Sequence, residues 1–92
     1  MAIGAIWSPP IDAATYDAVK ERVMQGAVDA GCRFHAAGAS PSGWRIIEVW
    51  DSEEGLEAFI RDTLDPAVQE VSGGRAPRME RPEVFEVYSQ AP

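Results

Sequence analysis

The sequence predicts an α+β fold in which a four-stranded antiparallel sheet carries two helices on one face. Three observations predict it. Short apolar runs bounded by proline or glycine alternate with longer stretches in which apolar residues recur every three or four positions. The runs follow the order strand, helix, strand, strand, helix, strand, and a Ser-Pro-Ser-Gly cluster at residues 40–43 marks a turn between the two central strands. With 92 residues, the chain has room for one domain, spanning residues 1–92.

The first strand and the first helix are expected before residue 32. Residues 2–7 form an apolar run that ends before two consecutive prolines, which lack the N–H donors of a sheet. Asp12 is a favoured N-cap residue for the helix that follows, and Gly26 or Gly31 ends that helix. The apolar stripe of this helix consists of Tyr16, Val19, Val23 and Ala27.

Residues 32–39 and 44–50 are expected to form a hairpin, and a turn of two or four residues fixes which positions face each other. On one face, the expected pairs are Arg33 with Trp50, His35 with Glu48, Ala37 with Ile46 and Ala39 with Trp44. On the other face, they are Phe34 with Val49, Ala36 with Ile47 and Gly38 with Arg45. The second set is small or apolar almost throughout, so we expect the helices to pack on it.

The second helix begins after Ser52, with two glutamates in its first turn, and ends at residues 72–74. Its apolar stripe consists of Leu56, Phe59, Ile60, Leu64, Ala67, Val68 and Val71. Pro66 interrupts this stripe, so we expect a kink or a break there, with Asp65 as the cap of a restarted helix. Residues 84–88 have the composition of a last strand.

The composition excludes several classes of protein. Hydrophobic residues make up 46% of the chain and charged residues 25%, as in ordinary globular proteins. Lysine and arginine number 8 against 15 acidic residues, and the resulting net charge of −7 argues against nucleic-acid and anionic-lipid partners. The single cysteine, Cys32, cannot form a disulfide within the chain, and no apolar run is long enough for a membrane span. With no signal-peptide pattern at the N-terminus, we expect a cytoplasmic protein.

The sheet face left without helices predicts self-association. In the expected register this face would present Trp44, Ile46 and Trp50, a larger apolar patch than a soluble monomer usually exposes. Two such faces in contact would form a homodimer with a closed, barrel-like body. Polar residues among the aromatic ones would then line a pocket inside it.

The chain resembles a known family through its hairpin and second helix. The segments HAAG and GWRIIEVWDS, followed by EEGLEAFIRDTLDPAV, are similar to those of the antibiotic biosynthesis monooxygenase-like proteins. The resemblance spans nearly the whole chain and implies a ferredoxin-like subunit, βαββαβ, within a dimeric α+β barrel. Relatives in this group include cofactor-free monooxygenases of aromatic polyketides, haem-degrading enzymes and lactone isomerases. The pattern of the haem-degrading relatives is not matched here, because the one histidine lies on a predicted strand and the chain contains no asparagine.

His35 and Glu48 are the sharpest candidates for chemistry. A carboxylate beside an imidazole can orient it as a general base, and Arg33 on the same predicted face could stabilise an enolate or a phenolate. Both polar groups could equally satisfy each other in an interface. The candidates for contacting an aromatic or apolar substrate are Trp44, Ile46, Trp50 and Tyr88.

Two functions remain open on these observations. One is a homodimeric protein that binds a small aromatic or apolar molecule, as a cofactor-independent monooxygenase or isomerase. The other is a non-catalytic module for dimerisation or protein interaction. We expect neither a metal site nor a cofactor, because no ligand spacing or phosphate-binding loop is present. The arginines at positions 75, 78 and 81 belong either to a solvated loop or to the mouth of a pocket.

Overall fold

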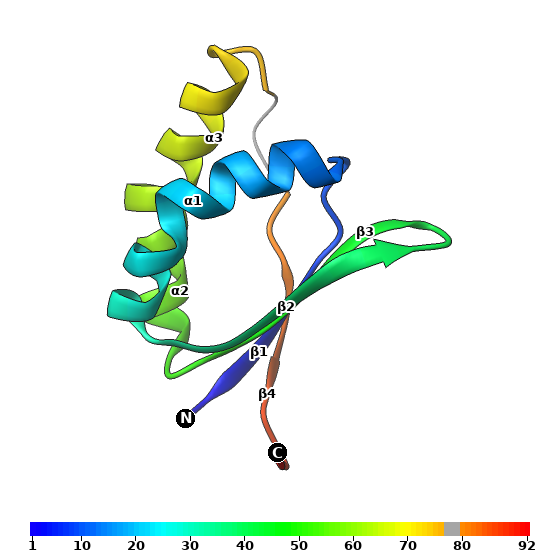
Figure 1. Ribbon diagram of the computed structural model, residues 1–92. Coiled ribbons are helices and arrows are strands. Elements are labelled where there is room, and N and C mark those ends of the chain that lie inside the picture. The colour runs from blue at the N-terminus through cyan, green and yellow to red at the C-terminus, as the bar shows by residue number, and fades with distance from the viewer. Residues whose placement is uncertain (77–79) are drawn as a thin grey trace.

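The structure is a computed structural model that describes residues 1–76 and 80–92. Its strands form one antiparallel sheet in the order β2-β3-β1-β4, and the helices lie together on one side of that sheet (Figure 1). This confirms the predicted α+β, ferredoxin-like fold. The elements are β1 (Ile3–Trp7), α1 (Ala13–Ala30), β2 (Cys32–Ser40), β3 (Gly43–Trp50), α2 (Glu53–Phe59), η1 (Ile60–Leu64), α3 (Asp65–Ser72) and β4 (Glu83–Glu86).

The two ends of α1 are set by local chemistry. The Asp12 side chain accepts a hydrogen bond of 2.8 Å from the backbone N–H of Thr15, which satisfies a free donor of the first turn. At the other end Gly31 adopts a left-handed conformation, with φ of 115°, and its N–H reaches back to the last carbonyls of the helix. The predicted N-cap is therefore confirmed, and Gly31, not Gly26, ends the helix.

The sequence predicted a kink or a break at Pro66, and the structure has no break there. The segments α2, η1 and α3 follow one another without an interruption, and Asp65 does not cap a new helix, because its own backbone is helical. Instead, η1 is a π-helical turn in which the Asp65 N–H donates to the carbonyl of Ile60, five residues back. A wider turn accommodates a proline, which supplies no N–H and whose ring would clash with the preceding turn.

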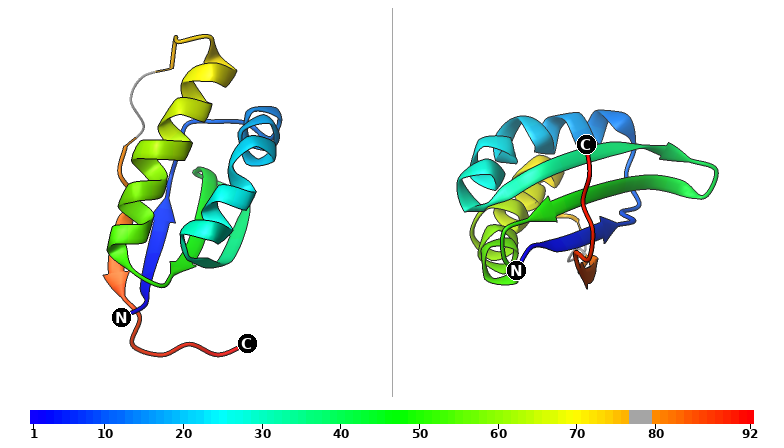
Figure 2. Two further views of the ribbon diagram at one scale, coloured as in Figure 1. Left: turned by 90° about the vertical axis from the view of Figure 1, so that its left-hand side faces the viewer. Right: turned by 90° about the horizontal axis from the view of Figure 1, so that it is seen from below.

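The prediction of which sheet face the helices cover was wrong. Trp50 is fully buried and packs against Phe59 of α2, with ring centroids 5.2 Å apart. On the opposite face Phe34, Ile47 and Phe85 are 51%, 49% and 48% exposed. All the helices lie on one side of the sheet (Figure 2). They cover the face that carries the tryptophans and His35, and the uncovered face is the one that carries Phe34. The larger aromatic surfaces are buried under the helices, where they gain more from leaving water.

The register of the hairpin is confirmed except at one residue. His35 lies opposite Glu48, and the turn consists of two residues between the paired Ser40 and Gly43. At the start of β2, however, Cys32 lies opposite Trp50, and the register shifts between Cys32 and Phe34. Arg33 is therefore the extra residue of a β-bulge, and the predicted pairing of Arg33 with Trp50 is wrong.

Candidate functional site

A cavity of about 900 Å³ lies between the helices and the sheet. Its walls come from β1 and the loop after it, from α1, from the two strands of the hairpin, and from η1 and α3. Most of the lining is apolar, but the polar side chains of Tyr16, His35 and Glu48 also reach it. A mostly apolar cavity with a few convergent polar groups is the usual form of a small-molecule site.

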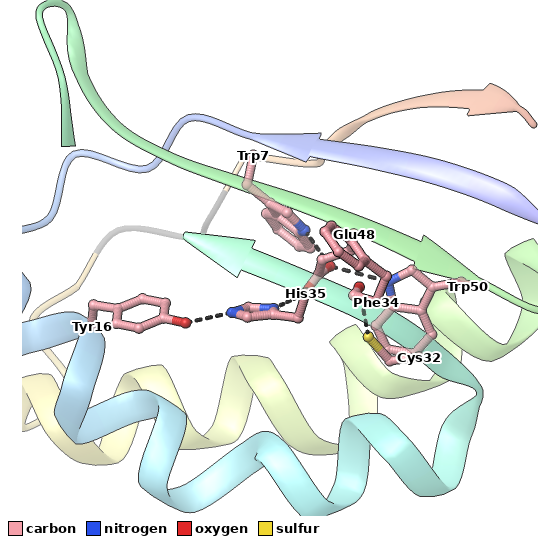
Figure 3. A network of polar contacts seen from close by, with 7 residues as sticks. All are labelled: Trp7, Tyr16, Cys32, Phe34, His35, Glu48 and Trp50. Atoms are coloured by element: carbon pink, nitrogen blue, oxygen red, sulfur yellow. Dashed lines mark hydrogen bonds and ion pairs between the residues drawn. The ribbon is translucent and has the colours of Figure 1, made fainter. Parts of the chain in front are cut away.

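Glu48 is the centre of the polar network at this cavity (Figure 3). Its Oε1 accepts hydrogen bonds from the indole N–H groups of Trp7, at 2.8 Å, and of Trp50, at 3.1 Å. Its Oε2 lies 2.8 Å from Nδ1 of His35. The residue is only 5% exposed, so these donors replace the water that a carboxylate would otherwise bind.

The contacts of His35 agree with one tautomer of the neutral imidazole. An ionised carboxylate only accepts hydrogen bonds, so in this tautomer Nδ1 carries the proton and donates to Glu48. Nε2 is then an acceptor for the hydroxyl of Tyr16. Both ring nitrogens of His35 are therefore engaged, and its side chain is 16% exposed.

Tyr16 brings α1 into the site. Its ring lies 5.9 Å from the imidazole of His35 in a stacked arrangement and 5.3 Å from the ring of Trp44. Burial, aided by the negative charges of Glu48 and Asp17, raises the pKa of Tyr16 above its ordinary value. The phenol thus stays protonated at neutral pH, as its hydrogen bond to His35 requires.

Three predicted substrate-binding residues lie on the helix-covered face, in different surroundings. Ile46 lines the cavity directly. Trp44 packs against Tyr16, and its indole N–H is buried without a hydrogen-bond partner among the described residues. Trp50 lies deeper, in the core, where its indole N–H donates to Glu48. Its side chain does not line the cavity.

The structure does not bring Arg33 and Tyr88 to the cavity. The bulge turns Arg33 away from His35, and its guanidinium pairs with Asp51, with Nε 2.9 Å from Oδ2. Both side chains of that pair are about half exposed, at 53% and 54%. Tyr88 follows β4 in the C-terminal tail and is fully exposed. Neither Arg33 nor Tyr88 is therefore part of the site at the cavity.

Other sequence candidates are placed as follows. Arg81 lines the cavity and forms an ion pair of 3.1 Å with Glu57, whereas Arg78 lies outside the described residues. Cys32 is buried, as expected, and burial with the nearby charge of Glu48 raises the pKa of its thiol from 9.0 to about 11. Such a thiol is a poor nucleophile at neutral pH.

Sequence reasoning missed Tyr16 and Trp7 as members of the network. Tyr16 was assigned to the apolar stripe of the first helix, and its hydroxyl group was the only sign that the stripe also had a polar end. Trp7 was assigned only to an apolar strand, but β1 pairs directly with β3 of the hairpin and places Trp7 opposite Ile46. Once the helices are placed on the His35 face, both residues fall next to His35 and Glu48.

Two kinds of feature are absent from the described ranges, 1–76 and 80–92. No group of three or more histidine, cysteine, aspartate or glutamate side chains is arranged to hold a metal ion there. No helix within them is both long enough and apolar enough to cross a membrane.

In sequence, the chain matches no family model and no curated protein. In structure, it is similar to a proposed antibiotic biosynthesis monooxygenase from Chloroflexus aurantiacus, at 26% identity and a TM-score of 0.55, over 100% of this chain and 96% of the other. For Rv0793 from Mycobacterium tuberculosis, identity is 18% and the TM-score 0.58, with 99% and 97% of the two chains covered.

A dimeric ferredoxin-like protein of unknown function from a Jannaschia species has 13% identity and a TM-score of 0.52, over 94% of this chain and 98% of its own. The resemblance that the sequence predicted is confirmed: this chain is similar in structure to the antibiotic biosynthesis monooxygenase-like proteins and shares their ferredoxin-like fold.

Proposed function

We propose that this protein binds a small aromatic or apolar organic molecule in the cavity between its helices and its sheet, and that it acts on that molecule without a cofactor. The reaction would be a monooxygenation or an isomerisation that begins with removal of a proton. The observation that carries the proposal is the opening of a polar chain, from Glu48 through His35 to Tyr16, into a cavity of about 900 Å³. The space is within the range of ordinary ligand sites, roughly 300–1,000 Å³.

The polar chain has the arrangement of a general base. Glu48 holds the imidazole of His35 in one tautomer and would stabilise the imidazolium that forms when a proton arrives. A buried carboxylate with three donors is also a plain structural network, and by itself it would not favour catalysis. The cavity beside it makes the difference, because a module without a substrate has no use for an open space of this size in its core.

Native mass spectrometry on gently purified protein tests the binding step, since it reports a retained small molecule and the number of subunits together. A matched pair of variants sharpens it. Val71→Trp fills the cavity from α3, whereas Val28→Trp adds the same side chain on α1, where Val28 is 45% exposed. We expect the first variant alone to lose the bound molecule. Retention by Val71→Trp would place the ligand elsewhere and refute the proposal.

The catalytic step is tested once that ligand is identified. His35→Ala should abolish its turnover and leave the subunit number unchanged, because His35 lies on the helix-covered face and not on the uncovered one. Unchanged turnover would remove the role of His35 as the base.

We also propose that the protein is a homodimer, formed through the uncovered sheet face instead of the tryptophan-bearing face that the sequence indicated. Phe34, Ile47 and Phe85, each about half exposed, lie on this face beside Ile6 and Val49. An apolar patch of this kind on one sheet favours contact with a second copy of itself. Dimerisation of the similar ferredoxin-like protein from Jannaschia supports the proposal.

Charge placed on the patch tests the dimer. Ile47→Glu should produce monomers in sedimentation velocity at a concentration at which the unaltered protein is dimeric. Val28→Glu, on the exposed side of α1, is the matched control and should leave the dimer intact. A dimer that survives Ile47→Glu would show that the contact is made through another surface.

A further inference from the structure

We infer that Tyr16, and not His35, is the residue that contacts the ligand, and that the ligand presents an acidic hydroxyl group, as in a phenol or an enol, to Tyr16 Oη. The inference rests on the proposed function and names the residue and the ligand chemistry of the same cavity. Four observations support it: the engagement of both histidine nitrogens, the place of Tyr16 on the cavity wall, the oxygen that Tyr16 offers, and the charge of Lys20.

His35 has no free nitrogen for a ligand. Nδ1 is taken by Glu48, at 2.8 Å, and Nε2 accepts from the hydroxyl of Tyr16. A ligand that used Nε2 directly would have to displace Tyr16, whose ring is held between the imidazole of His35 and the indole of Trp44. The outermost group of the chain is therefore the phenol of Tyr16, which lines the cavity.

The oxygen of Tyr16 can accept a second hydrogen bond. When Nδ1 of His35 carries the imidazole proton, the hydroxyl proton of Tyr16 points to Nε2, which leaves the lone pairs of the oxygen to accept a bond from a donor in the cavity. A ligand hydroxyl supplies such a donor, whereas a ketone, an ether or a hydrocarbon does not. The direction of the hydrogen bonds, set at the far end by Glu48, thus selects ligands that carry an O–H group.

Proton transfer along this chain balances without another reagent. The O–H bond of the ligand breaks and its proton goes to Tyr16 Oη, while the original proton of Tyr16 goes to Nε2 of His35. The ligand becomes a phenolate or an enolate, and His35 becomes an imidazolium beside the carboxylate of Glu48. Tyr16 is neutral before and after the step, so its raised pKa is no obstacle to the relay.

Lys20 lies near Tyr16, beside which the new anion would form. It follows Tyr16 by one turn of α1, lines the cavity, and places its Nζ 5.9 Å from the centre of the Tyr16 ring. The other charges near Tyr16, those of Glu48 and Asp17, are negative and disfavour an anion there. Lys20 is therefore the group that offsets them on the ligand side of the network.

Two probes and two variants test the inference. 4-Nitrophenol carries an acidic hydroxyl, and 4-nitroanisole is the same molecule with that hydroxyl methylated. We expect the unaltered protein to bind the phenol at least about tenfold more tightly, the difference that one well-formed hydrogen bond to a strong donor gives. Tyr16→Phe should abolish this preference and keep the affinity for 4-nitroanisole, whereas Tyr88→Phe, at the other tyrosine of the chain, should change neither.

The outcomes separate the inference from the proposed function. Equal binding of both probes by the unaltered protein, or a preference that survives in Tyr16→Phe, would overturn the role of Tyr16 and leave ligand binding in the cavity standing. Binding of neither aromatic probe would count against the proposed function, and the inference would fall with it.

A second measurement needs no ligand. His35 is the only histidine, so its two ring nitrogens give unique ¹⁵N signals. We expect a protonated Nδ1 and a hydrogen-bonded, unprotonated Nε2, with the Nε2 signal alone shifting strongly in Tyr16→Phe. An Nε2 signal that is identical in the two proteins would refute the relay.

Discussion

Replacement of Glu48 is expected to be the most damaging single change to a polar residue of this protein. Glu48→Ala leaves three donors without an acceptor: the indole N–H groups of Trp7 and Trp50, and Nδ1–H of His35. A buried donor that loses its partner costs roughly 1–3 kcal/mol, so for three donors we expect the free energy of unfolding to fall by about 3–9 kcal/mol. That is a large part of the stability of about 5–15 kcal/mol that is typical of small domains.

Glu48→Gln should cost much less, because its carbonyl oxygen can still accept from both indoles. The substitution removes the negative charge of the acceptor from three hydrogen bonds, which should lower the free energy of unfolding by about 1–3 kcal/mol in total. The amide nitrogen then faces Nδ1 of His35 as a donor, which forces the proton of the imidazole to Nε2. Nε2–H would donate to Tyr16, so the polarity of the whole chain is reversed in a protein that remains folded.

Urea unfolding, followed by tryptophan fluorescence at a fixed protein concentration, measures both variants. Glu21→Ala, at an exposed position of α1, is the matched control and should change the free energy of unfolding by less than about 0.5 kcal/mol. A Glu48→Ala variant within about 1 kcal/mol of that control would refute the claim that the network is satisfied only by this carboxylate. A Glu48→Gln variant as unstable as Glu48→Ala would show that charge, and not acceptor geometry, holds the two indoles.

Three further outcomes are expected. Because burial raises the pKa of Cys32 from 9.0 to about 11, the unfolded chain loses this proton first, and stability should fall between these pH values, less steeply in Cys32→Ala. Trp50→Phe should cost about 2–3 kcal/mol more than Trp44→Phe in urea unfolding, since only Trp50 gives up a bonded indole N–H and a fully buried volume. Gly55→Ala should lower stability by about 1–3 kcal/mol, because its Cβ would lie 2.4 Å from the last carbonyl oxygen of α1. Gly38→Ala is the control for that change and should be neutral or stabilising, because no described atom lies within 4 Å of the added Cβ.

The central pair of the site could be predicted from the sequence because it depends on local geometry. Two residues in the turn fix the register, and the register places His35 opposite Glu48 whatever covers the sheet. The position of Arg33 could not be predicted in this way, because a bulge depends on how the strand must twist and leaves no mark in the alternation of side chains. Tyr16 was hidden for another reason: its place in the network depends on how α1 lies across the sheet.

The choice of the covered face shows a limit of periodicity. Alternation separates the two faces of the hairpin, but both are apolar enough to be buried, so their pattern is nearly symmetrical. Glu48 and His35 suggested a polar pair inside a dimer interface. In the structure Trp7 and Trp50 supply the donors that let a carboxylate enter the core. The partner from β1 could not be known until the order of the strands was known.

The bulge at Arg33 separates the shape of β2 from the chemistry of the site. Cys32 and His35 both face the helices although two residues lie between them, a spacing that plain alternation would place on opposite faces, and the extra residue of the bulge makes this possible. If Arg33 were deleted, Cys32 would directly precede Phe34 and simple alternation would still place Phe34 on the uncovered face and His35 on the covered one. Residue 33 is therefore a place where the chain length can change by one, altering the bend of the edge strand and the exposed pair with Asp51, without moving the imidazole.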